Sequence, residues 1–217
     1  MKELVKYSRV AGYLEKLYDK LNAEFFGGEL TRPVITIQST TRAYGHYTLY
    51  NAWSVKGEGY REINIAAGTL NRPIENVCAT MLHEMVHQLN AEILKVQDCS
   101  RKGTYHNKLF KKEAEERGLI LHRSEKYGWS HTEPSDRLIE WIIENDIKEI
   151  PMTRNDLETF VPIGGSKAGN SGTPTRTGIG KSNSRRWVCP QCGTIIRSTR
   201  TVNVICGDCM TPFIETT

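Results

Sequence analysis

Two histidines four residues apart, with a glutamate directly after the first, lie in the apolar segment of residues 77–89. Four residues along an α-helix bring a side chain back to nearly the same face, so His83 and His87 would project together. Their neighbours indicate that this helix is buried. These apolar neighbours are Val77, Met81, Leu82, Met85, Val86 and Leu89. The fold must therefore surround a core helix that also presents two imidazoles and the carboxylate of Glu84.

This H-E-x-x-H pattern is typical of a zinc site, because two imidazoles on one helix face can bind a single Zn²⁺. Glu84 is the next residue round the helix, so it can reach a metal-bound water but is badly placed to be a ligand. A carboxylate there can take the proton of that water as it attacks a carbonyl, which the zinc also polarises. The pattern predicts peptide-bond hydrolysis without a covalent intermediate. The same pattern also arises by chance on amphipathic helices.

A catalytic zinc needs a third protein ligand and one open position. The metzincin pattern requires a glycine and a histidine where this chain has Asn90 and Ile93, so that class is excluded. We expect His106 to be the third ligand, because it opens a predicted helix that would pack against the H-E-x-x-H helix. Glu113 and Asp98 are the rival ligands, and Glu113 would make a His₂Glu site.

The surrounding segments predict an α+β fold. Apolar residues at helical spacing predict a helix over residues 8–26, capped by Ser8 and ended by Gly27 and Gly28. Strands are predicted at residues 33–38, 44–50 and 62–66, and further helices at about residues 72–89, 106–117 and 135–145. We expect the three strands to form a small antiparallel sheet. In the helix over 106–117, Phe110 would face inward.

Four of the six cysteines lie in the last 29 residues as two C-x-x-C pairs. The spacing C-x₂-C-x₁₃-C-x₂-C favours a structural Cys₄ zinc site over a redox pair. The ligands would be Cys189, Cys192, Cys206 and Cys209. Gly193 and Gly207 would permit tight turns, and a hairpin would contain Ile195, Ile196, Val202 and Val204. About 30 residues cannot hold a core unaided, so the metal would supply much of the folding energy.

Positive charge is concentrated at the C-terminal end. Residues 151–217 carry eight Lys/Arg and four acidic residues, which accounts for the whole net charge of +4. A basic tail favours a polyanionic partner, although a merely solvated tail has the same composition. In the zinc ribbon, Trp187 could stack on a base, and four arginines could contact phosphates. These are Arg185, Arg186, Arg197 and Arg200. A purely structural or protein-docking ribbon is the alternative.

Composition divides the chain into three parts. Thirteen of the 24 residues over 161–184 are Gly, Ser or Thr and none is acidic, which predicts a flexible linker. We expect a metalloprotease domain at residues 1–150, the linker at 151–184 and the ribbon at 185–217. No run of about 18 apolar residues suits a membrane span. The first residues lack the apolar region of a signal peptide, so a cytoplasmic location is expected.

The order of these motifs resembles the SprT-like metalloprotease family, to which the Spartan DNA–protein crosslink proteases belong. The resemblance rests on a T-x-L-H-E-M-x-H-type helix, here Thr80 to His87, preceded by an I-N-I-type strand. It also rests on a later histidine followed by an aromatic residue, and on the C-terminal zinc ribbon. It covers about residues 8–121 and 186–211.

This resemblance implies a zincin-like protease domain that often acts near DNA. It also implies that Glu84 is catalytic and that the catalytic zinc has the ligands His83, His87 and His106. The chain departs from the family pattern at residues 105–108, where no glycine adjoins the histidine, and at residues 123–150, which align with no counterpart. These departures concern the substrate more than the metal site. The chain is more similar to phage and mobile-element members, of bacterial type, than to Spartan.

We therefore expect a zinc metalloprotease with one catalytic and one structural zinc, a protein substrate, and DNA as a second candidate partner. Two other functions fit the sequence. The first is a DNA-binding zinc protein with little turnover, against which the intact Glu84 argues. The second is a zinc hydrolase that acts on something other than protein, which the sequence does not separate from a protease.

Overall fold

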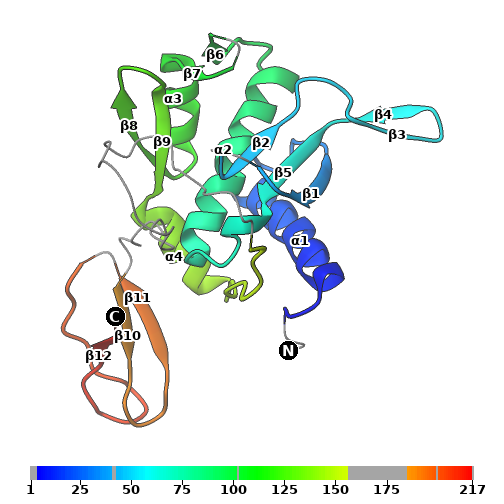
Figure 1. Ribbon diagram of the computed structural model, residues 1–217. Coiled ribbons are helices and arrows are strands. Elements are labelled where there is room, and N and C mark those ends of the chain that lie inside the picture. Colours follow the sequence, from blue (N-terminus) through cyan, green and yellow to red (C-terminus); the bar gives the residue numbers. More distant parts are fainter. Residues whose placement is uncertain (1–3, 41–42, 102, 156–184, 199, 217) are drawn as a thin grey trace, which may run out of the picture.

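The computed structural model describes residues 4–40, 43–101, 103–155, 185–198 and 200–216. These residues form a mixed α and β structure, as predicted (Figure 1). Within them, no helix combines the length and the apolar character needed to cross a membrane. Most of the predicted linker, residues 156–184, lies outside the described residues, so the domain boundaries stay predictions.

The first helix, α1 (Tyr7–Phe25), packs one apolar face into the core. Its buried apolar residues are Val10, Leu14, Leu17, Tyr18, Leu21 and Phe25. The predicted N-cap was wrong: Ser8 lies inside the helix, because Tyr7 is already helical and Lys6 occupies the cap position. Gly27 and Gly28 follow the helix with φ values of 62° and 76°. Glycine adopts this left-handed region without steric cost, so these two residues end α1 as predicted.

A three-stranded sheet follows, in the order β1-β5-β2. Its strands are β1 (Val34–Gln38), β2 (Gly45–Tyr47) and β5 (Glu62–Ala66). β2 runs antiparallel to β5, but β1 runs parallel to it, so the predicted antiparallel sheet is in fact mixed. The long excursion through residues 39–61 lets the chain return beside β1 in the same direction. Every residue of β5 is buried, as suits a central strand covered on both faces.

A hairpin that the sequence analysis did not predict projects from the body of the molecule in Figure 1. It pairs β3 (Trp53–Val55) with β4 (Glu58–Tyr60) around Lys56 and Gly57, whose φ values are 53° and 88°. Two consecutive residues with positive φ make the tight turn that suits a two-residue hairpin. Each strand has only three residues, which is too short for a periodic pattern to reveal it.

The helix α2 (Ile74–Glu92) runs through the middle of the molecule (Figure 1). Pro73 occupies its N-cap position, and Glu75 lies in its first turn. Fourteen of its 19 residues are buried, so it is a core helix and not an amphipathic surface helix. The predicted burial of this helix is confirmed.

The residues after α2 form a second layer with a four-stranded sheet in the order β6-β7-β9-β8. The elements are β6 (Cys99–Ser100), β7 (Tyr105–His106), α3 (Lys108–Glu116), β8 (Leu119–Ser124), β9 (Gly128–Pro134) and α4 (Asp136–Glu144). His106 was predicted to open a helix, but it lies on β7 because Asn107 caps α3. The Asn107 side chain accepts hydrogen bonds from the backbone N–H groups of Leu109 and Phe110. The helix predicted at residues 135–145 is present as α4, with Ser135 as its N-cap, whereas the β8–β9 hairpin was not predicted.

One pair of hydrogen bonds ties α1 to the segment after α4. The Tyr13 hydroxyl donates to the Lys148 carbonyl oxygen (3.1 Å) and accepts from the Lys148 backbone N–H (2.7 Å). Burial raises the pKa of Tyr13 to about 12, so the hydroxyl keeps its proton and remains a donor. Two segments separated by 135 residues are thereby joined.

The C-terminal unit is a three-stranded antiparallel sheet in the order β11-β10-β12. Its strands are β10 (Arg185–Val188), β11 (Ile195–Ser198) and β12 (Ile214–Thr216). The predicted hairpin was wrong in part, because Val202 and Val204 lie outside the strands. The chain instead reverses its direction at residues 189–194, which contain the first cysteine pair and connect β10 to β11.

Gly128 starts β9 in a place that only glycine fits. Its φ is 64°, and a Cβ there would lie 2.1 Å from the His106 carbonyl oxygen. We expect Gly128→Ala to lower the melting temperature and to displace His106, since the backbone must move to relieve the overlap. The control is Gly57→Ala, where φ is 88° but no atom lies within 4 Å of the added Cβ. Backbone strain alone should cost about 1 kcal/mol there. Equal losses of stability in thermal unfolding would contradict the close contact with His106.

Candidate metal centre

Three imidazoles from α2 and β7 meet at one point. The Nε2 atoms lie 3.1 Å apart for His83 and His106, 3.3 Å for His83 and His87, and 3.0 Å for His87 and His106. Three nitrogens bound to one tetrahedral zinc at about 2.0–2.1 Å are separated by roughly 3.3 Å. No further His, Cys, Asp or Glu of the described residues joins this group. The donor set fits zinc with one position left for water or substrate.

Two of the three clustered imidazoles, those of His83 and His106, are held in the neutral form. Burial, followed by the neighbouring His106 and His87, holds the pKa of His83 well below its usual value. Burial and His87 lower the pKa of His106 to about 3. A neutral imidazole has the free lone pair that a metal requires. The cluster is therefore suited to receive a cation.

The ring of Phe110 forms the floor of the cluster. Its centroid lies 4.6 Å from the centroid of each of the three imidazoles. Phe110 is fully buried, which confirms the prediction that this side of α3 faces inward. An apolar ring cannot be a ligand, so it acts by filling the space into which the imidazoles could otherwise rotate.

Two side chains contact the Nδ1 atoms of the imidazoles, which face away from the centre of the cluster. Asp98 Oδ2 lies 2.7 Å from His87 Nδ1, and Thr132 Oγ1 lies 3.3 Å from His83 Nδ1. Burial alone would raise the pKa of Asp98, but its hydrogen bonds with His87 and Asn90 hold that pKa below its usual value. An ionised carboxylate can only accept, so Nδ1 of His87 carries the proton and Nε2 presents its lone pair. Asp98, which the sequence offered as a rival ligand, therefore contacts His87 on the side away from the converging nitrogens.

Glu84 lies beside the cluster against the edge strand β2. Its side chain is buried, and this burial raises its pKa to about 7. The backbone N–H of Tyr47 donates a hydrogen bond to its carboxyl group. A Cβ on Gly45 would lie 3.2 Å from Glu84 Oε1 and 2.8 Å from the Asn64 carbonyl oxygen. Gly45 thus leaves room for the carboxyl group, a role that no spacing in the sequence reveals.

The other rival ligand, Glu113, takes no part in the cluster. Its carboxylate accepts from Arg117 at 2.7 Å and from Lys112 at 3.0 Å. Burial opposes its ionisation, but these two cations hold the pKa of Glu113 below its usual value. Glu113 therefore serves an ion-pair network of α3, and the His₂Glu alternative has no support in the geometry.

The four cysteines of the ribbon form the second candidate metal site. Their Sγ atoms all lie within 4.8 Å of one another. Each pair makes the same turn, in which the N–H of residue 193 or 210 donates to the carbonyl of Cys189 or Cys206. Gly193 has φ 74° as expected, but in the second turn the positive φ, 50°, belongs to Met210 and not to Gly207. The two turns are equivalent, and only the first has glycine at the strained position.

The predicted nucleic-acid residues are not equally accessible. Trp187 is only 8% exposed, so its ring face is covered within the ribbon. Arg197 forms ion pairs with carboxylates of the N-terminal part of the chain. Arg185 and Arg186 are exposed on β10, and the Arg200 side chain is 83% exposed. Contacts with nucleic acid stay a prediction for these three.

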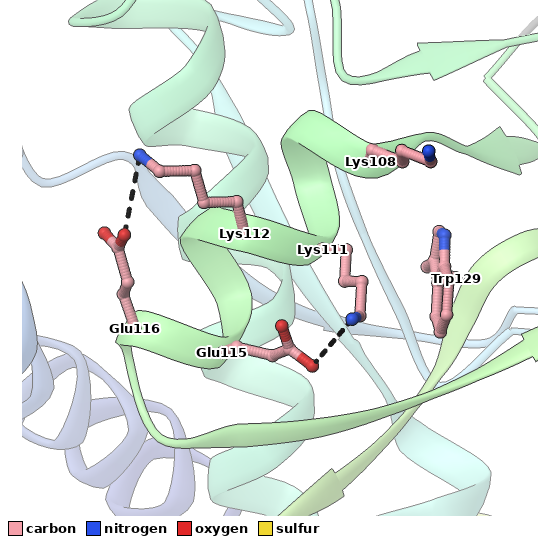
Figure 2. Close-up of a pocket in the computed structure, with 6 residues that line it drawn as sticks. All are labelled: Lys108, Lys111, Lys112, Glu115, Glu116 and Trp129. Atoms are coloured by element: carbon pink, nitrogen blue, oxygen red, sulfur yellow. Dashed lines mark ion pairs between the residues drawn. The ribbon is translucent and has the colours of Figure 1, made fainter.

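A separate cavity of about 380 Å³ lies on the outer side of α3. Figure 2 shows Lys108 and Lys111 on the same side of the helix as Trp129, with the Lys111 Nζ 4.5 Å from the indole ring. Lys111 and Lys112 also form ion pairs with Glu115 and Glu116. These lysines are thus partly neutralised, and the metal centre uses none of the residues that line this cavity.

A family model described as the SprT-like family matches residues 14–124, which is 111 of the 217 residues. The match runs from within α1 to the end of β8, so it includes Glu84 and the three clustered histidines. It leaves out β9, α4 and the ribbon. Comparison with curated proteins gave no match, and comparison with solved structures gave none either.

The contact between Asp98 and His87 can be tested through metal affinity. Asp98→Asn keeps the size of the side chain but no longer requires a proton on His87 Nδ1. We expect zinc affinity at the histidine cluster to fall about 10–100-fold, as is usual when a partner behind a ligand is lost. Competition with a chromophoric chelator measures it. Glu113→Gln, the matched control on α3, should leave zinc affinity unchanged. Wild-type affinity in Asp98→Asn would show that Asp98 does not orient His87.

Proposed function

Because this chain belongs to the SprT-like family, we propose that it is a zinc-dependent metallopeptidase. In this proposal His83, His87 and His106 hold the catalytic zinc, and Glu84 is the general base. A structural zinc is held by Cys189, Cys192, Cys206 and Cys209. The observation that carries the proposal is the convergence of the three Nε2 atoms to within 3.3 Å of one another. Glu84 follows directly on His83, so its carboxyl group can reach the fourth coordination position of the zinc, which is left for water.

Zinc in this cluster would activate a water molecule and polarise the carbonyl of the scissile bond. The carboxylate of Glu84 takes the proton of the attacking water on one of its oxygens. It then delivers this proton to the amide nitrogen as the carbon–nitrogen bond breaks, so the amine leaves neutral. Asp98 and Thr132 keep the imidazoles of His87 and His83 in place throughout. Because Glu84 is buried, bulk water has little access to the proton that its carboxyl group carries.

We also propose that a polyanion such as DNA is a partner of the ribbon. The exposed Arg185 and Arg186 of β10 and the excess of positive charge in residues 151–217 support this proposal. The alternative is a DNA-binding zinc protein with little turnover, and the position of Glu84 beside the metal cluster speaks against it. A zinc hydrolase with another substrate is the third candidate.

The replacement of Glu84 by Gln separates these functions. We expect Glu84→Gln to lower the rate of cleavage of an unfolded protein such as casein at least about 100-fold, because the general base is lost. Zinc content by atomic emission should stay at the wild-type value of two ions per chain, since Glu84 is not a ligand. The assay is run with and without single-stranded DNA. Equal cleavage by wild type and variant, or no cleavage by wild type under either condition, would contradict the peptidase proposal.

A further inference from the structure

Three carboxylates at the starts of α2 and α4 contact the ribbon and have no part in the proposed chemistry. We call them the docking surface: Glu75 lies in the first turn of α2, Glu149 contacts the start of α2, and Asp136 lies in the first turn of α4. The Glu75 side chain is only 1% exposed, although it is a carboxylate in the first turn of the core helix. Glu149 accepts a hydrogen bond from the backbone N–H of Ile74 (3.1 Å), which is otherwise a free donor at the helix start. Negative charge is therefore collected at the positive end of the α2 dipole.

Two arginines of the ribbon reach this docking surface. Arg197 on β11 places Nη1 3.3 Å from Glu75 Oε2 and forms an ion pair with Glu149 through Nη2. Its side chain is only 20% exposed, so it is largely buried between the two carboxylates. Arg200 Nη2 lies 3.7 Å from Asp136 Oδ2, in a more exposed position. Figure 1 shows β11 as the strand of the ribbon nearest to α4.

The junction is held by charge more than by apolar packing. A cavity of about 270 Å³ remains between α4 and the ribbon, and Ile139, Ile143 and Val202 contribute its apolar wall. Incomplete packing of this kind is typical of a contact that forms and opens, whereas a permanent interface is closely packed. A guanidinium group matches a carboxylate in charge and shape, so Arg197 supplies the specificity of the contact.

We propose that the docking surface is the seat of the chain's own zinc ribbon and that docking orders the first turns of α2. Arg197 offsets part of the buried negative charge of Glu75, and weaker compensation of a buried charge is unfavourable. The same helix carries His83 and His87, so a contact of the ribbon with the start of α2 acts on the helix that positions the histidine cluster. In the docked state Arg197 is also withheld from phosphate groups. This inference does not depend on peptidase activity.

Hydrogen exchange in the full-length chain tests the docking. Arg197→Ala should speed the exchange of the amides in the first two turns of α2 about 10-fold, which corresponds to about 1.4 kcal/mol. The matched control is Arg186→Ala, since Arg186 is an exposed arginine on the neighbouring strand β10. It should leave this exchange unchanged. Adding Glu75→Gln to Arg197→Ala should restore slow exchange, because the buried charge is then removed.

A second measurement covers the case in which α2 stays ordered for other reasons. Arg197→Glu places three carboxylates together, so small-angle scattering should give a larger radius of gyration than for wild type. Zinc content in the same samples verifies that the ribbon itself is intact. Exchange in Arg197→Ala equal to that in Arg186→Ala would overturn the inference, and so would an unchanged radius of gyration in Arg197→Glu. Neither readout involves peptide cleavage, so failure here is distinguishable from failure of the proposed function.

Discussion

The proposed site depends on the packing of three imidazoles against one phenylalanine ring. His83 and His87 come from α2, His106 comes from β7, and Phe110 comes from α3, so three elements must be seated before the nitrogens converge. The burial of apolar surface holds these elements in position, because Phe110 is fully buried and each imidazole lies against it. Hydrogen bonds such as the one from His87 to Asp98 then select the tautomer. The metal would bind to a site that the core has already shaped.

Features set by local periodicity or spacing could be predicted from the sequence, and features set by long-range geometry could not. The burial of α2 followed from its apolar flanks. His106 was chosen because it was expected to open an inward-facing helix, and it joins the two histidines although it lies on β7, just before that helix. The parallel pairing of β1 with β5 could not be read from the strands, because it depends on the path of the intervening residues. Asp98 was considered as a ligand because it is a carboxylate nearby in sequence. Its actual place depends on how the loop after α2 folds back onto His87.

The contacts made by the charged residues of the ribbon also could not be predicted from the sequence. Arg197 was predicted to contact phosphate, and in the structure it contacts the carboxylates of Glu75 and Glu149. Both groups offer a guanidinium the same pair of anionic oxygens, so residue type alone cannot distinguish them. A count of basic residues therefore overstates the surface that is open to a polyanion. Within the ribbon, the short sheet and two turns bury little apolar area, which leaves the cysteine cluster as the main source of cohesion.

The tie between Tyr13 and Lys148 has a consequence for how the molecule is made. A ribosome releases the chain from its amino end, so His83, Glu84, His87 and His106 all emerge before Lys148. The matched family segment ends at residue 124, also ahead of this tie. A nascent chain that ends before Lys148 contains the three proposed ligands of the catalytic zinc, but its α1 is not yet hydrogen-bonded to the segment that follows α4. A stop codon between residues 124 and 148 would yield a product that keeps every proposed catalytic residue and lacks the hydrogen bonds that close its fold.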